Sequence, residues 1–342
     1  MKMIYLPVSD ESLKMAADIL RGGGLVAFPT ETVYGLGADA FNPQALAKIF
    51  EVKGRPHFDP LIIHIAGLET LEKIADLSLL SAQTREKLFL LAENLLPGPL
   101  SLVLPKNEKI PGIATAGLAT VAIRFPDNEA AQKLISLSSG AVAAPSANPF
   151  GSLSPTKAEH VRDKLGEKVD IILDGGQTRI GLESTVLDMT GESIKILRPG
   201  GAPKEAIEKL VGHVRDASLN AENAGQRPQV SPGQMKSHYA PKIPLLVFSR
   251  EEIIRLPCEK DRAYLFFDGC SRDAWFAAQK QKPSAVVKVL SEAGQPLEAA
   301  SHLFEILHEL ENSEVSQIAA QLAPQEGLGE AINDRLRRGS VK

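Results

Sequence analysis

A polar segment divides this 342-residue chain into two parts, each of which alternates short apolar runs with amphipathic stretches. Between positions 216 and 236 only three large apolar residues occur, among Asn, Gln, Gly, Ser, Pro and charged residues. Such a composition cannot bury enough apolar surface to fold by itself. The sequence therefore predicts two domains, residues 1–212 and 243–342, joined by a linker over 213–242.

The first part interleaves predicted strands and helices without one fixed βαβ period. Apolar residues spaced by three and four predict helices over 12–21 and 43–52, and mostly helical periodicity runs over 68–96. Short apolar or β-branched runs predict strands at 25–28, 61–65, 100–104, 120–124, 142–144, 171–173, 185–188 and 194–197. This mixture predicts an α/β domain with a twisted, mixed sheet.

The second part repeats the alternation on a smaller scale. Strands are predicted at 245–248, 263–267 and 285–290, with helices near 251–256 and over 297–310. The longer of these helices has a clear apolar stripe. The pattern predicts a smaller, Rossmann-like α/β domain at the C-terminal end.

The charge balance limits the partners of the chain. It has 38 Lys and Arg against 42 Asp and Glu, a formal net charge of −4. A dedicated nucleic-acid binder needs a surplus of cations for phosphate contacts, and aromatic residues make up only 5% of the chain. An RNA-binding module is therefore the less favoured class of function, and direct RNA binding is expected to be weak or absent.

The two cysteines, Cys258 and Cys270, lie in no CxxC motif or Cys/His cluster, so zinc-ligand spacing is absent. Isolated thiols fit a reducing compartment. No window reaches the roughly 18 apolar residues of a membrane span. We expect a cytoplasmic protein outside the membrane.

Several familiar catalytic motifs are also missing from the sequence. Neither GxxxxGK[ST] nor GxGxxG occurs, which disfavours a Walker-type ATPase and a Rossmann dehydrogenase. GxSxG is absent as well, so a serine nucleophile has no support.

Polar residues gather where predicted elements end. The segment Pro29–Gly37 (PTETVYGLG) follows a predicted strand, where α/β sheets place ligands. On these residues alone, a capped strand-to-helix turn is the more probable interpretation. Lys53 and Arg55 flank Gly54 at the end of a predicted helix. Two cations there suit either an oxyanion or the helix dipole.

Five further positions or segments also carry polar residues in or near predicted strands. Each can be explained by a ligand site or by an ordinary structural role. His64 is more often a core histidine than a ligand, and Arg124 suits a carboxylate or, slightly more often, an internal ion pair. The segments 144–148 and 183–185, and Arg198, suit a polar pocket or ordinary turns. Together these positions predict a pocket for an anionic ligand.

The motifs PTETVYGLG, KGRP, PGPLSLVLP, AIRFP, APSANPFGSLSPT, ESTV and ILRPG, in this order, resemble the YrdC-like family of threonylcarbamoyl-AMP synthases. SPGQMKSHYAP and GLGEAINDRLRRGS resemble the two-domain branch of that family. The resemblance covers nearly the whole chain and implies a nucleotidyltransferase with a YrdC-like sheet. Such an enzyme makes L-threonylcarbamoyl-adenylate and pyrophosphate from L-threonine, bicarbonate and ATP with Mg²⁺. Its product passes to the machinery that makes threonylcarbamoyladenosine next to the tRNA anticodon.

The resemblance also implies site residues, motif by motif, but no metal ligands. The implied catalytic core is Lys53, Arg55, Ser146 and Asn148. The implied ATP contacts are Arg55, Asp59, Thr120, Ser146, Ser154, Arg198 and Tyr239. The implied threonine contacts are Thr32, His64, Arg124, Ala144 and Ser184.

Two positions raise questions of their own. Asp59 departs from the Asn that is usual in the family, and its carboxylate would repel phosphates, so we expect it to hold Mg²⁺ or Arg55 instead. The linker, with His238 and Tyr239 near its end, is either a lid over the pocket or a passive spacer. The resemblance favours the lid.

Overall fold

The computed structural model describes residues 3–217, 238–279 and 284–341. Contacts divide the chain into two compact units. The short segments 151–153 and 179–182 group with the second unit, although they precede the predicted linker. Most of that linker lies outside the described residues, so its boundaries and its action as a lid stay predictions.

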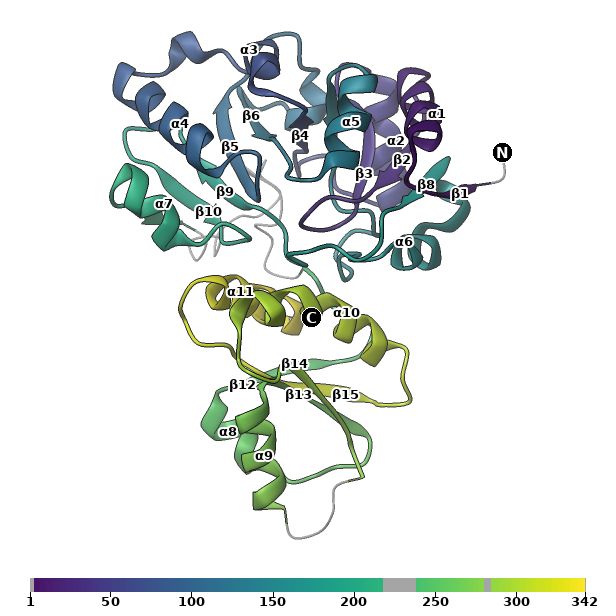
Figure 1. Ribbon diagram of the computed structural model, residues 1–342, viewed down its shortest axis with the longest axis vertical. Helices are drawn as coiled ribbons and strands as arrows, with labels where there is room; N and C mark the ends of the chain where they lie inside the picture. The colour runs from purple at the N-terminus through teal and green to yellow at the C-terminus, as the bar shows by residue number, and fades with distance from the viewer. Residues whose placement is uncertain (1–2, 218–237, 280–283, 342) are drawn as a thin grey trace. The chain divides into compact units, whose positions relative to one another are not determined.

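The first unit is built on one mixed sheet of 11 strands, ordered β1-β8-β2-β3-β7-β4-β6-β5-β9-β10-β11 (Figure 1). The strands are β1 (Ile4–Pro7), β2 (Val26–Phe28), β3 (Gly35–Asp39), β4 (Ile62–Ile65), β5 (Leu100–Pro105), β6 (Thr120–Arg124), β7 (Ala141–Ala143), β8 (Ile171–Asp174), β9 (Thr185–Asp188), β10 (Lys195–Arg198) and β11 (Arg215–Asp216). Parallel and antiparallel pairs both occur, as in β4–β6 and β5–β6. The predicted mixed sheet is confirmed.

Helices flank this sheet. They are α1 (Asp10–Arg21), α2 (Pro43–Lys53), α3 (Leu71–Ile74), α4 (Ala82–Leu95), α5 (Glu129–Leu137), α6 (Ala158–Leu165) and α7 (Lys204–Val211). The predicted helical stretch over 68–96 is instead divided into α3, α4 and two short 3₁₀ turns. Ser81 begins α4 by accepting a hydrogen bond from the Thr84 backbone N–H, which makes a separate N-terminus there.

The segment Pro29–Gly37 was expected to be a capped turn between a strand and a helix. Its first part is a turn bonded by the Thr30 hydroxyl, but a strand and not a helix follows, so that part of the expectation is wrong. This strand, β3, begins at Gly35 and pairs antiparallel with β2 and β7. A Cβ on Gly37 would lie 2.8 Å from the Phe28 ring and 2.9 Å from Val142. The two glycines of GLG let the strand lie against these bulky neighbours, while Leu36 enters the core.

Strand register places a polar row on one face of the sheet. His64 of β4 is the register partner of Arg124 of β6, which in turn is the partner of Ser101 of β5. Successive side chains of a strand point to opposite faces. Ile63 and Ile123 accordingly lie in the main apolar core on the other face. We call the face that carries His64, Arg124 and Ser101 the site face.

Helices cover only part of the site face. Leu20 of α1 and Leu134 of α5 share an apolar cluster with Phe28 of β2, Val142 of β7 and Leu173 of β8. Figure 1 shows α1 and α5 beside these strands. The helices α2, α4, α6 and α7 contribute instead to the main core on the opposite face. The polar row therefore lies on the stretch of the site face next to the part that α1 and α5 cover.

The second unit is built on a four-stranded sheet of order β12-β15-β13-β14, in which all neighbouring strands are parallel. Its strands are β12 (Leu245–Phe248), β13 (Arg262–Asp268), β14 (Val286–Ser291) and β15 (Gln317–Gln321). Its helices are α8 (Arg250–Arg255), α9 (Gly269–Ala278), α10 (Pro296–Glu311) and α11 (Leu328–Ser340). Parallel strands joined by helical crossovers confirm the predicted Rossmann-like domain.

A glycine after β10 should be essential for local packing. A Cβ on Gly200 would lie 2.3 Å from the Ser184 carbonyl carbon and 2.4 Å from Glu183 O and Thr185 N. These are backbone atoms, which cannot rotate away. We expect Gly200→Ala to lower the free energy of unfolding in urea by about 1–3 kcal/mol. Gly112→Ala, whose Cβ would meet nothing within 4 Å, is the control. Equal losses in both variants would contradict this packing.

Candidate functional site

A left-handed glycine at the end of α2 sets the positions of Lys53 and Arg55. Gly54 has φ 62°, and the Arg55 N–H donates back to Phe50 O at 2.9 Å. A residue without Cβ takes this conformation at little cost, which ends the helix sharply. Both flanking cations are buried. The KGRP motif is thus a helix cap that also brings two cations into the interior.

Lys53 braces the loop after β7. Its Nζ donates to the carbonyls of Ser146 and Asn148, both at 2.5 Å. The Phe150 N–H donates to the Lys53 carbonyl at 2.7 Å. Three of the predicted catalytic residues, Lys53, Ser146 and Asn148, therefore lie together, and the lysine fixes the conformation of the other two.

Five charged side chains interact electrostatically with Lys53, with Asp59 or with both, and we call them the cation cluster: Lys53, Arg55, Asp59, Glu183 and Arg198. Burial lowers the pKa of Lys53 well below its ordinary value, and the charge of Arg55 lowers it further. Burial raises the pKa of Asp59, which the three cations oppose. With all five groups charged the cluster carries 3 − 2 = +1, a charge that suits a polyphosphate.

Asp59 holds Arg55, one of the two roles expected for it. The Arg55 Nη2 lies 2.9 Å from the Asp59 Oδ2, and its Nε donates to the Asp59 carbonyl at 3.0 Å. Nη2 also donates to Pro60 O at 2.6 Å. These contacts fix the plane of the guanidinium group.

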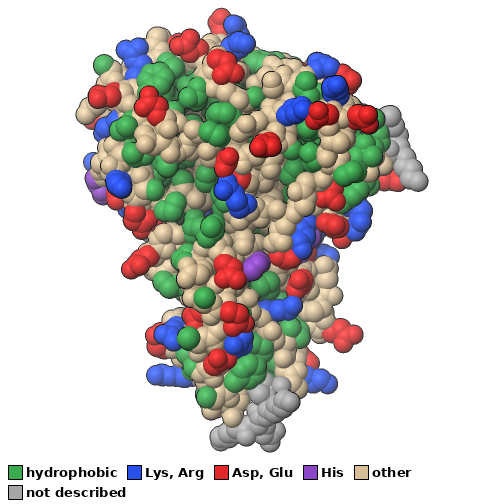
Figure 2. Space-filling view, in the orientation of Figure 1, with side chains coloured by type: hydrophobic (Ala, Val, Ile, Leu, Met, Phe, Trp, Pro, Cys, Tyr) green, Lys and Arg blue, Asp and Glu red, His purple; other side chains and the backbone are tan. Residues whose placement is uncertain are grey.

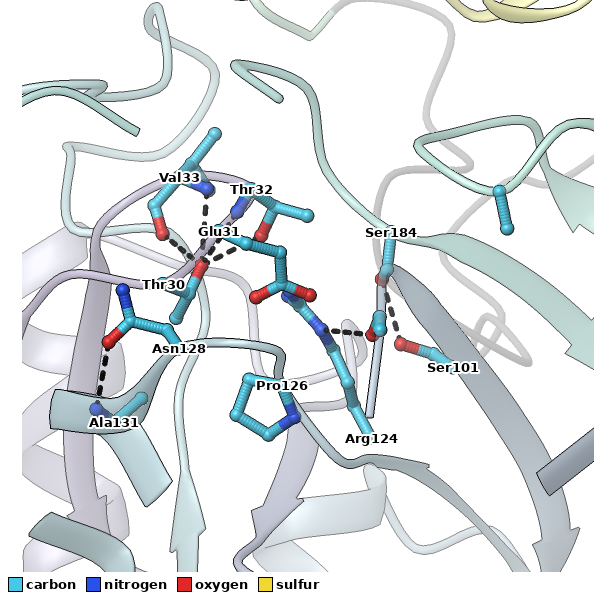
Figure 3. Close-up of polar contacts among 12 residues, drawn as sticks. Thr30, Glu31, Thr32, Val33, Ser101, Arg124, Pro126, Asn128, Ala131 and Ser184 are labelled. Carbon is cyan, nitrogen blue, oxygen red and sulfur yellow. Dashed lines mark hydrogen bonds and ion pairs between the residues drawn. The ribbon is translucent and has the colours of Figure 1, made fainter. Parts of the chain in front are cut away.

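Ser184 connects the cation cluster to the polar row of the site face. Arg198 donates to the Ser184 carbonyl from Nε at 3.2 Å and from Nη2 at 2.9 Å. The Ser184 hydroxyl lies 2.7 Å from the Ser101 hydroxyl (Figure 3). Ser101 is the register partner of Arg124. The two serines therefore lie between Arg198 of the cation cluster and the strand position beside Arg124.

A threonine-based turn follows β2. The Thr30 hydroxyl donates to Val33 O at 2.7 Å and accepts from the Thr32 N–H at 3.1 Å. The two threonine hydroxyls are 2.8 Å apart. Such side-chain bonds fix a turn in place of backbone pairing. These bonds therefore fix the backbone that carries Glu31.

Glu31 faces Arg124 across the site face (Figure 3). The Arg124 Nη2 lies 2.7 Å from the Glu31 Oε1, and the side chains are 5% and 1% exposed. The internal ion pair considered for Arg124 is therefore present. Its role in binding a carboxylate stays a prediction.

His64 is buried beside Arg124. Burial, assisted by the Arg124 charge, lowers the pKa of His64 from 6.5 to about 3. Its Nδ1 lies 3.3 Å from Ile62 O. At neutral pH the ring is therefore uncharged, and it can act toward a ligand only as a neutral hydrogen-bonding group.

The remaining expected residues are more dispersed. The Ala144 N–H donates to Ile62 O at 3.0 Å, which places Ala144 beside β4. The Ser154 hydroxyl donates to Glu183 of the cation cluster. Thr120 begins β6 and so lies at the opposite end of this strand from Arg124.

Tyr239 belongs to the second unit. Its φ is 63°, and its ring lies 5.7 Å from the Phe304 ring and 4.9 Å from the Arg335 guanidinium carbon. Its expected contact with ATP stays a prediction.

Sequence reasoning assigned no role to three residues of the site: Glu31, Ser101 and Glu183. Each lies inside a motif that was quoted for the resemblance, so its place in the chain was visible. Burial of Glu31 and the pairing of Ser101 with Ser184 depend on strand register and loop closure. The pattern of residue types alone does not give these.

The buried His64 should make the free energy of unfolding depend on pH. Because its folded pKa of about 3 lies below the unfolded 6.5, the unfolded chain binds the proton first as the pH falls. The stability contribution is complete above pH 6.5 and is lost toward about 3, at up to about 1.4 kcal/mol per pH unit. We expect His64→Gln to lose stability less steeply over this window in urea titrations. Parallel curves for the two proteins would contradict a buried neutral ring.

Comparison with known proteins finds matches along nearly the whole chain. A family model described as telomere recombination matches residues 18–200, and one described as threonylcarbamoyl-AMP synthase, C-terminal domain, matches residues 202–340. The threonylcarbamoyl-AMP synthase of Pyrococcus abyssi is 40% identical, over 97% of this chain and 95% of its own length. That of Bacillus subtilis is 40% identical over 98% and 94%.

Solved structures give the same result. A crystal structure of Pyrococcus abyssi Sua5 complexed with L-threonine superimposes with a TM-score of 0.87 at 39% identity. The match covers 99% of this chain and 98% of the other.

Proposed function

We propose that the buried clusters of the first unit carry out the reaction of the threonylcarbamoyl-AMP synthase family, to which this chain belongs in its two-domain form. Members are nucleotidyltransferases that make L-threonylcarbamoyl-AMP with ATP. One observation carries the assignment of residues. Ser184 contacts Arg198 of the cation cluster and also Ser101, the register partner of Arg124. Ser184 can therefore belong both to an amino-acid site and to a phosphate site.

The amino-acid site lies on the site face. L-threonine is bound in the related Pyrococcus structure. Arg124 would bind the carboxylate of threonine, since arginine matches a carboxylate with two parallel N–H groups. His64, neutral by burial, would offer a hydrogen bond without adding a second charge. The proposed set is Thr32, His64, Arg124, Ala144 and Ser184.

The nucleotide site is the cation cluster together with the braced loop. Lys53, Arg55 and Arg198 would neutralise the triphosphate, and Asp59 would hold Arg55 in its orientation. Because a triphosphate favours the charged form of a buried amine, ATP would raise the pKa of Lys53, against the lowering that burial causes. The proposed ATP contacts are Arg55, Asp59, Thr120, Ser146, Ser154, Arg198 and Tyr239, with Lys53 and Asn148 completing the catalytic core.

In this reaction the bonds form and break between the substrates, and the residues of the site do little covalent chemistry themselves. The threonine amine, after losing a proton, adds to bicarbonate and gives a carbamate and water. A carbamate oxygen then attacks the α-phosphorus of ATP, and the bond to the bridging oxygen breaks as pyrophosphate leaves. Positioning of the two reactants and neutralisation of phosphate charge account for the catalysis.

Mg²⁺ fits this site as an ion that arrives with ATP. Among the described residues, no group of three or more His, Cys, Asp or Glu side chains could hold a metal ion. Mg²⁺ commonly binds phosphate oxygens and water with only one or two carboxylates. Asp59 and Glu183 are the carboxylates of the cation cluster that would supply them. When bound, the ion would neutralise charge on the phosphates.

The product would leave for a separate tRNA-modifying machinery. Threonylcarbamoyl-AMP is a mixed anhydride, so a second enzyme can transfer its acyl group. On the face in Figure 2, Lys and Arg side chains are interspersed with Asp and Glu rather than gathered by sign. This supports weak or absent direct binding of tRNA.

The cytoplasm is the proposed compartment. Both cysteines, Cys258 and Cys270, are free thiols, and Cys270 is exposed, which fits a reducing environment. Separately, none of the described helices is both long and apolar enough to cross a membrane.

The activity can be tested directly. Purified protein is incubated with ATP and each amino acid in turn, with and without bicarbonate, and pyrophosphate release is measured. We expect release to require both L-threonine and bicarbonate. Release with other amino acids at a similar rate, or without bicarbonate, would contradict the proposed reaction.

Replacing Lys53 distinguishes the proposed nucleotide site from the proposed amino-acid site. We expect Lys53→Met to lower the rate of pyrophosphate release by about 100-fold or more, because one donor to the transferring phosphate is lost. Threonine affinity, measured by calorimetry, should change by less than about threefold, a difference below roughly 0.7 kcal/mol.

Lys48→Met is the matched control in the same helix. Lys48 is exposed, and its Nζ donates to Gly23 O at 2.6 Å. Activity of Lys53→Met equal to that of this control would remove Lys53 from the catalytic core.

A further inference from the structure

Glu31 carries unused hydrogen-bonding capacity at the centre of the amino-acid site. Its carboxylate is 1% exposed and lies 2.7 Å from the Arg124 Nη2. Neither of its oxygens, nor that Nη2, makes a hydrogen bond of good geometry with any described residue. Buried polar atoms are nearly always satisfied, so a buried ion pair in this condition needs a physical explanation.

Other carboxylates of the chain show what a structural ion pair looks like here. In the second unit, Asp334 accepts from the Arg335 Nη1 at 2.6 Å and from the Arg338 Nε at 2.8 Å, one donor on each oxygen. Among the described residues, Asp59 is the other carboxylate with two buried oxygens that lack such a bond, and it belongs to the proposed nucleotide site. Unsatisfied buried carboxylates thus coincide with the two proposed ligand sites.

The carboxylate is also held in place. The Thr30 hydroxyl fixes the turn through Val33 O and the Thr32 N–H. Figure 3 shows the Glu31 carboxylate directed at the Arg124 guanidinium group, with Ser184 and Ser101 on the far side of Arg124. A fixed anion beside a fixed cation is the complement of a zwitterion.

We propose that Glu31 binds the α-amine of the amino-acid substrate, so that the Glu31–Arg124 pair recognises both charges of a zwitterionic α-amino acid. This rests on the proposed function of the first unit. Arg124 takes the carboxylate and Glu31 takes the ammonium group, each through charge-assisted hydrogen bonds. The ligand supplies the donors that the buried carboxylate lacks.

The same contact acts in opposite ways on the reactant and on the product of the first step. The step R–NH₃⁺ + HCO₃⁻ → R–NH–COO⁻ + H₂O + H⁺ forms one C–N bond, breaks one C–O bond and releases the proton to solvent. It converts a cation beside Glu31 into an anion. Glu31 therefore attracts the reactant amine and repels the carbamate. This repulsion would direct the new carboxylate away from Glu31.

Two analogues of threonine separate this role from simple positioning of Arg124. (R)-3-hydroxybutanoate keeps the carboxylate and the hydroxyl but has no amine. L-threoninamide keeps the amine and replaces the carboxylate by a neutral amide. If Glu31 binds the amine, Glu31→Gln weakens L-threonine and L-threoninamide by about 10- to 100-fold and changes the hydroxy acid by less than about threefold. Dissociation constants are measured by calorimetry on the full chain.

The opposite pattern overturns the proposal. A Glu31→Gln variant that loses the hydroxy acid but keeps L-threoninamide would show that Glu31 acts only through Arg124. Glu31→Asp keeps the charge on a shorter side chain, and we expect it to bind threonine more tightly than Glu31→Gln does. If Glu31→Gln does not fold, as judged by thermal unfolding, Glu31→Asp decides. A selective loss of the two amine ligands supports the contact, and no selective loss contradicts it.

The result also separates this inference from the function on which it rests. Wild-type protein that binds no L-threonine would contradict the proposed function. Wild-type protein that binds L-threonine, with Glu31→Gln binding all three ligands equally well, would contradict only the role of Glu31.

Discussion

The arrangement of the first unit depends on the burial of one ammonium group. Removing a lysine charge from water costs several kcal/mol unless partners replace the lost hydration. Lys53 recovers part of this through the carbonyls of Ser146 and Asn148 at 2.5 Å, and through the nearby carboxylates Asp59 and Glu183. The same contacts join the end of α2 to the loop after β7. The group proposed to meet phosphate is therefore also the group that shapes the loop, so its charge and its structural role cannot be varied independently.

The second unit fixes the end of the linker by close backbone packing. The His238 N–H donates to Arg338 O at 3.3 Å, and a Cβ on Gly339 would lie 2.8 Å from Tyr239 O. Arg335, almost fully buried, lies against the Tyr239 ring. The GLGEAINDRLRRGS motif is thus the surface of α11 on which the HYA segment packs. The described HYA end of SPGQMKSHYAP and the GLGEAINDRLRRGS motif therefore share one physical reason, their packing on each other.

Sequence reasoning could predict what depends on local pattern. Gly54 after a periodic helix predicts a cap, and apolar alternation around His64 predicts a buried strand position. It failed where a long-range neighbour decides the outcome. Gly35–Asp39 forms a strand only because β2 and β7 lie on either side of it. The burial of Glu31 likewise depends on Arg124, 93 positions away in the sequence.

A carboxylate inside a site for anionic ligands is explained by the state before the ligand binds. Arg124 and Arg55 are both buried, and a buried guanidinium group without an anion would be strongly unfavourable. Glu31 and Asp59 supply that anion at 2.7 Å and 2.9 Å. Each carboxylate keeps its arginine oriented, which reduces the ordering that a ligand must impose. Because neither carboxylate is fully hydrogen-bonded by the described residues, each retains capacity for a positive group, which we propose to be an amine beside Glu31 and a metal ion beside Asp59.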